Sequence, residues 1–294
     1  MILIDGKKVA GDIKKDLQRE VARWQEQGFR PPNLVAVLLG DDPASLAYVR
    51  NKERQAKKIG FNSSLIRLAS STPEEKLLHL IQSLNNDQTV DGYIIQLPLP
   101  AHINPHNIIQ AIDPDKDVDG SHPLNLGRLL IGMPSFIPAT PYGIIELLKR
   151  YRIPTDGKNI LIIGRSLIVG RPLSILLSQK RPEGNATVTL AHSHTKNLID
   201  YTRQADIIVT ALGKPYFLKA DMVKNGVVII DAGINEISDP SQHRGYKLVG
   251  DTDFEQVSQK ASYMTPVPGG VGPMTIAMLL KNTFKAYKNH LKLA

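Results

Sequence analysis

Short runs of β-branched and leucine residues alternate with longer segments of helical periodicity along most of the chain. One apolar face recurs every three to four residues in the helical segments, as at Ile13, Leu17, Val21 and Trp24. Strands that alternate with helices predict parallel sheets covered on both faces by helices. The predicted strands are 33–40, 63–68, 92–97, 159–163, 186–190, 206–212 and 227–232.

The stretch from Pro114 to Pro138 interrupts this alternation, because it is rich in Pro, Gly and Asp and has only short apolar runs. A chain of 294 residues is longer than most single domains, so two domains are expected. We interpret this stretch as the junction between them. A cleft at such a junction is a favoured ligand site.

Composition narrows the class of protein. Hydrophobic residues make up 42% of the chain and charged residues 22%, as in soluble globular proteins. The absence of cysteine excludes disulfides, zinc–thiolate sites and a thiol nucleophile. No secretory signal and no segment of membrane-spanning length is recognisable, so we expect a cytoplasmic protein without a membrane partner. The net charge of +8 comes from scattered lysines and arginines, which favours a surface that attracts anions over a nucleic-acid-binding patch.

A glycine-containing turn at residues 164–172, G-R-S-L-I-V-G-R-P, follows the apolar run 160–163. Gly164 permits a tight turn, and Gly170 allows the backbone at the start of the next helix to approach a ligand. Amides at a helix start bind anions. A glycine after a strand is also common in α/β proteins generally, so the strand that follows has to be considered with it.

That following strand ends in Ala-His-Ser-His-Thr at 191–195, without the carboxylate that dinucleotide folds often place there to bind ribose hydroxyls. Arg165 is expected to reach this place from the first turn and pair with a phosphate, while Ser193 donates a hydrogen bond. The turn therefore predicts NADP rather than NAD as cofactor. We interpret His192 and His194 as ordinary surface residues.

A second group of polar residues lies in the first half of the chain. Tyr48 and Lys52 are four residues apart on one helix face. Desolvation lowers the pKa of a lysine, so that a buried Lys52 exchanges protons nearer neutrality, with the Tyr48 phenol beside it. Most helical lysines are solvated instead. A catalytic role would require Gln96, at the end of a predicted strand, and Asp119, in an acidic turn, to lie close by.

Five motifs in the chain resemble those of the bifunctional methylenetetrahydrofolate dehydrogenase/methenyltetrahydrofolate cyclohydrolase family. The resemblance extends over nearly the whole chain, with the motifs in order and at plausible spacing. They are Y-V-x-x-K at 48–52, Q-L-P-L-P at 96–100, K-D-V-D-G at 116–120, G-R-S-x-I-V-G-x-P at 164–172 and T-P-V-P-G-G-V-G-P-M-T at 265–275.

The resemblance implies a bifunctional enzyme that oxidises methylenetetrahydrofolate with NADP and then hydrolyses the methenyl product to formyltetrahydrofolate in the same cleft. It implies that Lys52 is essential to hydrolysis, with Tyr48 beside it and Gln96 tuning it, and that Asp119 binds the pterin. Substrate-binding residues would be Tyr48, Lys52, Gln96, Leu97, Pro98, Asp119, Gly270, Gly272 and Pro273. Cofactor-binding residues would be Gly164, Arg165, Ser166, Gly170, Ser193 and Ile234.

The expected architecture is α/β with two domains. Residues 1–138, completed by a C-terminal helix at 271–294, would form the folate-binding catalytic domain. Residues 139–270 would form a Rossmann-like NADP-binding domain with a parallel sheet. The resemblance also implies a homodimer, no metal and no nucleic-acid partner.

Three positions depart from the family pattern. Ser121 stands where an aromatic residue is expected, Ala139 where cysteine is frequent, and Thr252 where valine is usual. None of them removes a proposed chemical group. They bear on the packing near the pterin and on the balance of the two activities.

Two alternatives belong to other functional classes. One is a two-domain dehydrogenase acting on shikimate-like or amino-acid substrates, which would have no cyclohydrolase activity. The other is a nucleotide-sensing or nucleic-acid-binding protein that uses the basic surface. Formation and decay of the methenyl chromophore in the presence of the folate substrate and NADP distinguishes all three.

Overall fold

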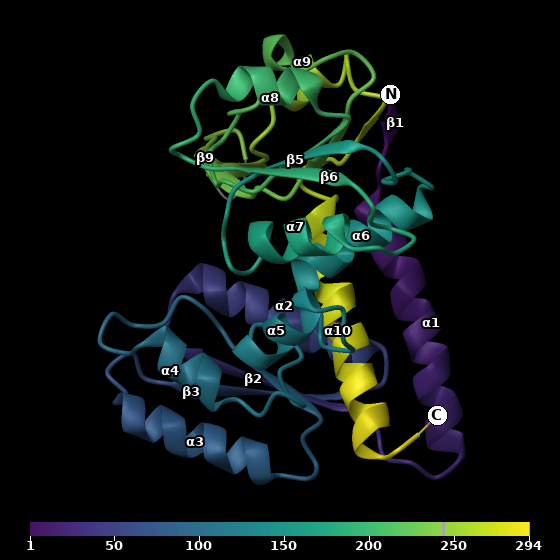
Figure 1. Ribbon diagram of the computed structural model, residues 1–294. Coiled ribbons are helices and arrows are strands. Elements are labelled where there is room, and N and C mark those ends of the chain that lie inside the picture. The colour runs from purple at the N-terminus through teal and green to yellow at the C-terminus, as the bar shows by residue number, and fades with distance from the viewer. Residues whose placement is uncertain (243–244, 294) are drawn as a thin grey trace. The chain divides into compact units, whose positions relative to one another are not determined.

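The computed structural model describes residues 1–242 and 245–293, and its helices and strands alternate through both halves of the chain (Figure 1). The helices are α1 (Gly6–Glu26), α2 (Pro43–Lys58), α3 (Glu74–Asn86), α4 (Pro105–Ala111), α5 (Pro123–Leu130), α6 (Ala139–Arg150), α7 (Gly170–Ser178), α8 (Leu198–Gln204), α9 (Phe254–Val257) and α10 (Val271–His290), with a 3-10 turn at Ala220–Met222. The strands are β1 (Ile2–Leu3), β2 (Asn33–Leu39), β3 (Asn62–Leu68), β4 (Gly92–Ile95), β5 (Asn159–Ile163), β6 (Thr187–Ala191), β7 (Ile207–Thr210), β8 (Val228–Asp231), β9 (Asn235–Ser238), β10 (Tyr246–Val249) and β11 (Tyr263–Met264).

The chain divides into two compact units, and neither is a single continuous segment. Unit 1 comprises Met1–Ala10 and Pro138–Thr275, whereas unit 2 comprises Gly11–Ile137 and the residues from Ile276 onward. The expected boundaries assigned residues 1–10 to the same domain as 11–138. They group with unit 1 because β1 pairs with β11 and because the amide of Asp5 donates to the hydroxyl of Tyr151 at 2.7 Å.

Unit 2 is built on a three-stranded parallel sheet in the order β3-β2-β4. The central strand β2 is buried along nearly its whole length, so its side chains face apolar layers on both sides. Val35, Val37 and Leu39 pack against α3 and α4 on one face. Helix α2 lies across the other face (Figure 1). The carboxyl ends of the three strands therefore share one edge, beside α2.

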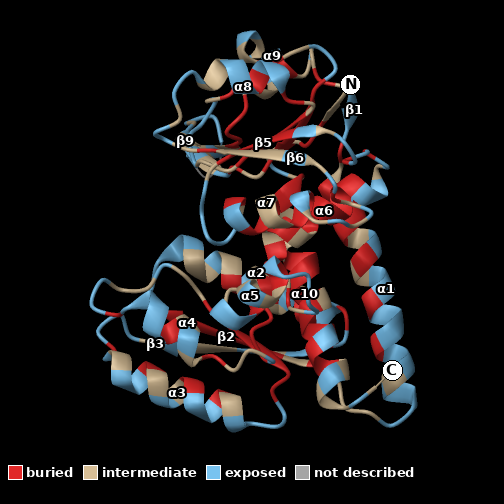
Figure 2. Ribbon diagram, viewed as in Figure 1, coloured by how far each residue is buried: buried red, intermediate tan, exposed pale blue. Residues whose placement is uncertain are grey.

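Unit 1 contains a six-stranded sheet in the order β1-β11-β8-β7-β5-β6, with all of its pairings parallel. Helices α8 and α9 cover one face of this sheet, and α6 and α7 lie on the other (Figure 1). The buried residues follow the strands and the inward faces of these helices (Figure 2). A separate antiparallel hairpin joins β9 to β10.

The predicted strands are confirmed, with ends that agree within two residues. The short strands β1 and β11, of which β1 is the edge strand, and the hairpin β9–β10 are additional elements that the apolar runs did not indicate. The expected junction contains helix α5, and the chain passes between the units at its end, at residues 137 and 138. No helix within the described residues combines the length and the hydrophobicity needed to cross a membrane.

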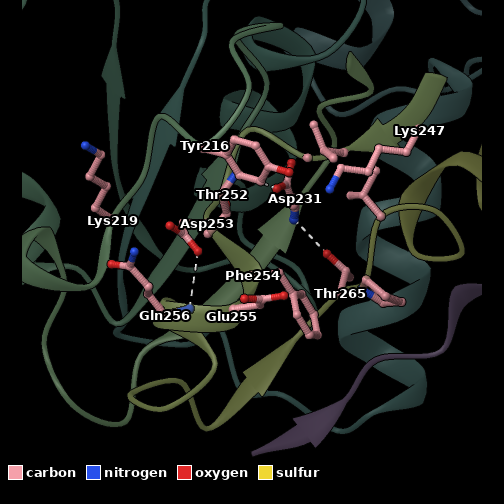
Figure 3. A pocket seen from close by; sticks show the side chains of 14 residues that line it. Tyr216, Lys219, Asp231, Lys247, Thr252, Asp253, Phe254, Glu255, Gln256 and Thr265 are labelled. Carbon is pink, nitrogen blue, oxygen red and sulfur yellow. Dashed lines mark hydrogen bonds between the residues drawn. The ribbon is translucent and has the colours of Figure 1, made fainter. Parts of the chain in front are cut away.

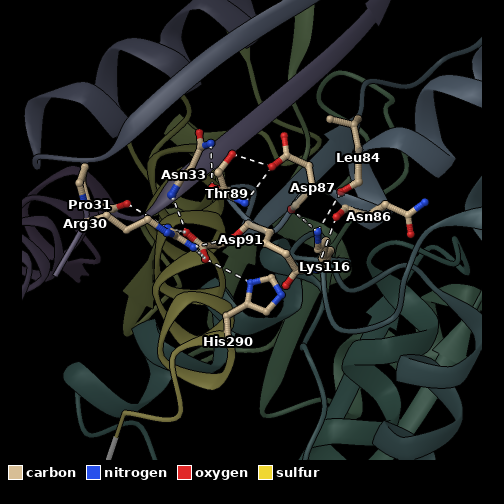
Figure 4. Close-up of polar contacts among 11 residues, drawn as sticks. Arg30, Pro31, Asn33, Leu84, Asn86, Asp87, Thr89, Asp91, Lys116 and His290 are labelled. Carbon is tan, nitrogen blue, oxygen red and sulfur yellow. Dashed lines mark hydrogen bonds and ion pairs between the residues drawn. The ribbon is translucent and has the colours of Figure 1, made fainter.

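In unit 2, hydrogen bonds to the buried carboxylate of Asp91 connect the end of α10 with the residue that precedes β4 (Figure 4). The carboxylate of Asp91 is fully buried and accepts two hydrogen bonds from Arg30, both at 2.7 Å. The amide of Asn33 donates to the same carboxylate at 2.8 Å, and Nδ1 of His290 lies 3.3 Å from it. Because Asp91 is fully desolvated, these partners determine whether its charge is tolerated.

Candidate active site

Helix α2 places Lys52 on its inward face. The side chain of Asp42 accepts a hydrogen bond from the amide of Ser45 at 2.8 Å, which caps the helix and fixes its start. The buried positions of the helix are Val49, Lys52 and Ala56, so the lysine is in line with the residues that pack on the sheet. Lys52 is only 7% exposed.

The ammonium of Lys52 has two neighbours from the predicted site. Its Nζ donates to Oε1 of Gln96 at 3.2 Å and lies 4.4 Å from the centre of the Tyr48 ring. Burial lowers the pKa of Lys52, and the negative charge of Asp119 partly opposes this change. Burial, together with Asp119, raises the pKa of Tyr48 to about 12, so its phenol is protonated at neutral pH.

Gln96 is positioned by the sheet. Its amide donates to the carbonyl of Val37 at 2.9 Å, which continues the pairing of β4 with β2 by one residue. Its Nε2 donates to the carbonyl of Leu97 at 2.7 Å, so that Oε1 is left to accept from Lys52. Leu97 is half-buried and Pro98 is exposed beside it.

Asp119 completes this group at the end of a turn that runs beside β4. The amide of Tyr93 donates to the carbonyl of Lys116 at 3.1 Å, and Tyr93 forms an isolated bridge with Asp117. The carboxylate of Asp119 is half-buried, and its charge acts on both Tyr48 and Lys52. Unit 2 therefore brings together a desolvated lysine, a protonated phenol, an amide and a carboxylate. This set suits proton transfer to and from a bound ligand.

The glycine turn after β5 packs closely against backbone carbonyls. Gly164 has φ of +128°, and a Cβ there would meet the carbonyl of Ala211. A Cβ on Gly170, the first residue of α7, would meet the carbonyl of Gly164, so neither position accommodates a side chain. Arg165 and Ser166 are exposed between these glycines, and Oγ of Ser166 accepts from the amide of Val169 at 3.1 Å. The turn has the compactness and the exposed polar groups that fit a nucleotide phosphate.

Arg165 acts electrostatically on the loop that follows β6. Burial lowers the pKa of His192, and the charges of Arg165 and His194 lower it further. The guanidinium is therefore near the end of β6, where Ser193 is exposed. The hydroxyl of Thr195 accepts from the amide of His192 at 2.9 Å and so closes this loop.

The other residues expected at the cofactor and folate lie at the same carboxyl edge of the sheet. Ile234 follows β8 and is 59% exposed, although it is a large apolar side chain. A Cβ on Gly272 would lie 3.5 Å from Cδ1 of Ile234, so this side chain is adjacent to the glycine-rich segment. Gly270 is buried, and Gly272 and Pro273 are half-buried in the first turn of α10.

Two buried carboxylates, Asp231 and Asp251, accept hydrogen bonds from the loops at this edge of the sheet. Neither was identified from the sequence. Asp251 accepts from the amides of Leu212, Gly213 and Lys214 at 2.7, 3.2 and 2.8 Å and from Nδ2 of Asn235 at 2.9 Å. Asp231 accepts from the amides of Gly233, Asp251 and Thr252 at 2.9, 3.2 and 2.7 Å. The only signals in the sequence were an aspartate at a strand end and the Gly-Asp pair at 250–251.

Asp231 also lines a pocket of about 660 Å³, with Thr252 and Thr265 near it (Figure 3). The hydroxyl of Thr265 accepts from the amide of Asp231 at 2.7 Å. The Thr252 hydroxyl lies 3.3 Å from that of Thr210, so the departure from valine at this position adds a partnered hydroxyl rather than an unsatisfied one. Within residues 1–242 and 245–293, no cluster of His, Asp or Glu side chains is suited to hold a metal ion.

Both halves of the chain match models of the same protein family. Residues 4–119 match the catalytic domain of tetrahydrofolate dehydrogenase/cyclohydrolase, and residues 138–291 match its NAD(P)-binding domain. The Lys52 group lies in the first match, and the glycine turn lies in the second.

Individual relatives are similar over almost their full length. The bifunctional protein FolD of Flavobacterium johnsoniae is 57% identical over 288 residues, which are 98% of each chain. The crystal structure of the bifunctional enzyme FolD from Campylobacter jejuni has a TM-score of 0.92 at 46% identity, with 98% of this chain and 99% of that chain covered. A Trypanosoma brucei methylenetetrahydrofolate dehydrogenase-cyclohydrolase, complexed with NADP cofactor and inhibitor, has a TM-score of 0.94 at 37% identity, with 99% of each chain covered.

Proposed function

The chain belongs to the tetrahydrofolate dehydrogenase/cyclohydrolase family, and from this premise we infer that it catalyses two consecutive reactions of one-carbon folates. The first oxidises methylenetetrahydrofolate to methenyltetrahydrofolate with NADP. The second hydrolyses the methenyl product to formyltetrahydrofolate. The observation that carries this function is the burial of Lys52 against Gln96 and Tyr48, inside the part of the chain that matches the catalytic domain.

The dehydrogenase step requires little proton chemistry. Bound NADP would supply the hydride acceptor, and loss of hydride from the bridging carbon of the folate would leave a delocalised methenyl cation. The protein's contribution is to hold the two ligands in position. We assign Gly164, Arg165, Ser166, Gly170, Ser193 and Ile234 to cofactor binding. The carboxylate-free loop after β6 and the charge of Arg165 beside it fit the additional phosphate of NADP.

The cyclohydrolase step requires proton transfer at two places. Water adds to the methenyl carbon and loses one proton. The ring nitrogen gains a proton as its bond to that carbon breaks, and the hydroxyl left on the carbon loses its remaining proton to become the carbonyl of the formyl group on the other nitrogen, so that one proton is released overall. We assign these transfers to Lys52, because its pKa is lowered by burial and its ammonium is held by Gln96. The protonated Tyr48 phenol beside it is a hydrogen-bond donor at neutral pH.

We assign recognition of the pterin to Asp119. The adjacent ring N–H and amino group of a pterin are matched by the two oxygens of a carboxylate. We assign the remaining folate contacts to Leu97, Pro98, Gly270, Gly272 and Pro273. The family resemblance further supports a cytoplasmic homodimer that binds no nucleic acid.

The decisive experiment follows the methenyl chromophore. Purified protein is mixed with methylenetetrahydrofolate and NADP, and NADPH and methenyltetrahydrofolate are recorded together. The proposal expects NADPH to accumulate while the methenyl signal rises and then decays. NADPH without decay would contradict the cyclohydrolase assignment. No NADPH formation would contradict the dehydrogenase assignment.

A further inference from the structure

Asp117, two residues before the proposed pterin-binding carboxylate, is a buried charged side chain that the reactions above do not use. It is 1% exposed. Among the described residues it has no ion pair, although burying an ionised carboxylate without compensation is costly. Four hydrogen-bond donors converge on it instead. The amide and hydroxyl of Ser121 lie 3.1 and 3.3 Å from Oδ1, while the amide of His122 and Nδ2 of Asn125 lie 2.8 and 2.9 Å from Oδ2.

The residues on either side of Asp119 are also held by hydrogen bonds. The amide of Gly120 donates to the carbonyl of Asp117 at 3.1 Å, so residues 117–120 form a closed turn. The carbonyl of Val118 accepts from Nδ2 of Asn282 at 2.9 Å. Asp119 is therefore preceded by the Val118 carbonyl, which is bonded to Asn282, and followed by the amides that donate to the Asp117 carboxylate. We call the four hydrogen bonds to this carboxylate the Asp117 cap.

Lys116, on the other side of Asp117, is anchored independently. Its Nζ donates to the carbonyls of Leu84 and Asp87 at 2.9 and 2.7 Å, at the C-terminal end of α3 (Figure 4). Lys116 thus bonds the beginning of the turn to the end of α3. The Asp117 carboxylate bonds the end of the turn, because it accepts from the amide of His122 at the start of α5. Lys116 and Asp117 have different partners and do not neutralise each other.

We propose that Asp117 is a positioning residue for the folate reactions, and that its ionised carboxylate holds the 117–122 turn in the conformation that presents Asp119 to the pterin. This inference rests on the proposed pterin role of Asp119. Ser121, one of the departures from the family pattern, supplies two of the four donors. Its amide would be present with another side chain, so the serine itself adds one donor, the hydroxyl, to Asp117 in this chain.

Burial, reinforced by the charge of Asp119, raises the pKa of Asp117 to about 6, so the carboxyl is ionised at pH 8. An ionised carboxylate accepts from all four donors, whereas an amide in its place carries donors of its own and cannot. Because burial disfavours the charged form, protonation does not open the turn, and the proposal is tested at pH 8, where the charge is present.

The test measures KM for methylenetetrahydrofolate and KM for NADP in the dehydrogenase reaction at pH 8. Asp117→Asn places an amide donor against the converging donors. Its KM for methylenetetrahydrofolate is expected to be raised about tenfold or more, with KM for NADP unchanged.

Two further variants separate this effect from a loss of folding. Asp115→Asn removes an exposed carboxylate from the same segment and is expected to behave as the parent. Ser121→Ala removes one of the four donors and is expected to raise KM for methylenetetrahydrofolate by a smaller factor than Asp117→Asn does, with KM for NADP unchanged. If Asp117→Asn folds and keeps the parent KM for methylenetetrahydrofolate, or raises both KM values alike, the carboxylate does not position Asp119 and the proposal is wrong. Absence of NADPH formation by the parent protein at pH 8 would instead reject the underlying function.

Discussion

Nζ of Lys52 lies 3.2 Å from Oε1 of Gln96. The lysine comes from α2 and the glutamine from the end of β4, so this hydrogen bond joins a helix to the sheet edge on which it packs. Gln96 accepts without contributing a negative charge. The ammonium is therefore held in place while burial still lowers its pKa.

Lys52→Met is expected to separate the two reactions. Methionine keeps the apolar stem but removes the titratable group, and loss of a general acid or base costs about 100- to 10,000-fold. Hydrolysis of added methenyltetrahydrofolate should fall by a factor in this range, while NADP reduction continues and the methenyl product accumulates. The control is Lys57→Met, an exposed lysine of the same helix. Near-parental hydrolysis by Lys52→Met would make Lys52 a structural residue only.

Asp119→Ala is expected to impair both reactions together. A carboxylate that binds the pterin acts on the substrates of both steps, so KM for each folate should rise by about tenfold or more. Steady-state kinetics with each substrate in turn checks this, and the exposed Asp115→Ala serves as control. A defect confined to one reaction would be inconsistent with a pterin contact.

Arg165→Ala is expected to weaken NADP binding more than NAD binding. A charge-assisted hydrogen bond to the additional phosphate is worth about 1.5–3 kcal/mol, which corresponds to a loss of roughly 10- to 150-fold. Dissociation constants for both cofactors measure the difference. Arg171→Ala, an exposed arginine in the first turn of α7, is the matched control. Equal losses for NADP and NAD would remove Arg165 from phosphate recognition.

Arg30→Met is expected to destabilise the fold without touching the site. It leaves the fully buried Asp91 without its bidentate partner, and breaking a buried ion pair in this way costs about 3–5 kcal/mol. Chemical denaturation provides the free energy of unfolding. Arg19→Met removes the exposed pair with Asp16 and should change this free energy by less than about 1 kcal/mol. Similar losses in the two variants would mean that the Asp91 pair adds little.

The main strands could be predicted from the sequence, because parallel strands that are covered on both faces consist of continuous apolar runs, as in β2 and β5. The edge strand β1 has only two residues, and its pairing with β11 joins positions far apart in the chain. No local pattern carries that information. For the same reason, the association of residues 1–10 with unit 1 did not follow from composition.

Contacts between distant parts of the chain also limited what could be predicted of the site. The spacing of Tyr48 and Lys52 indicated a shared helix face, and the end of a strand indicated Gln96, but burial of the lysine depends on how α2 packs. Asp231 and Asp251 escaped notice because their partners are mainly backbone amides, which every residue except proline provides. Side-chain chemistry is visible in a sequence, whereas the geometry of main-chain donors is not.

The division of α1 and α10 between the units has a practical consequence for dissecting the protein. Helix α1 begins in unit 1 and ends in unit 2, and α10 does the same. With the crossing at residues 137 and 138, the polypeptide passes between the units three times. Truncation at any single bond would thus sever secondary structure or leave one unit without a terminal segment. Isolated expression of either unit would require a redesigned connectivity, with its two sequence segments rejoined by a new linker.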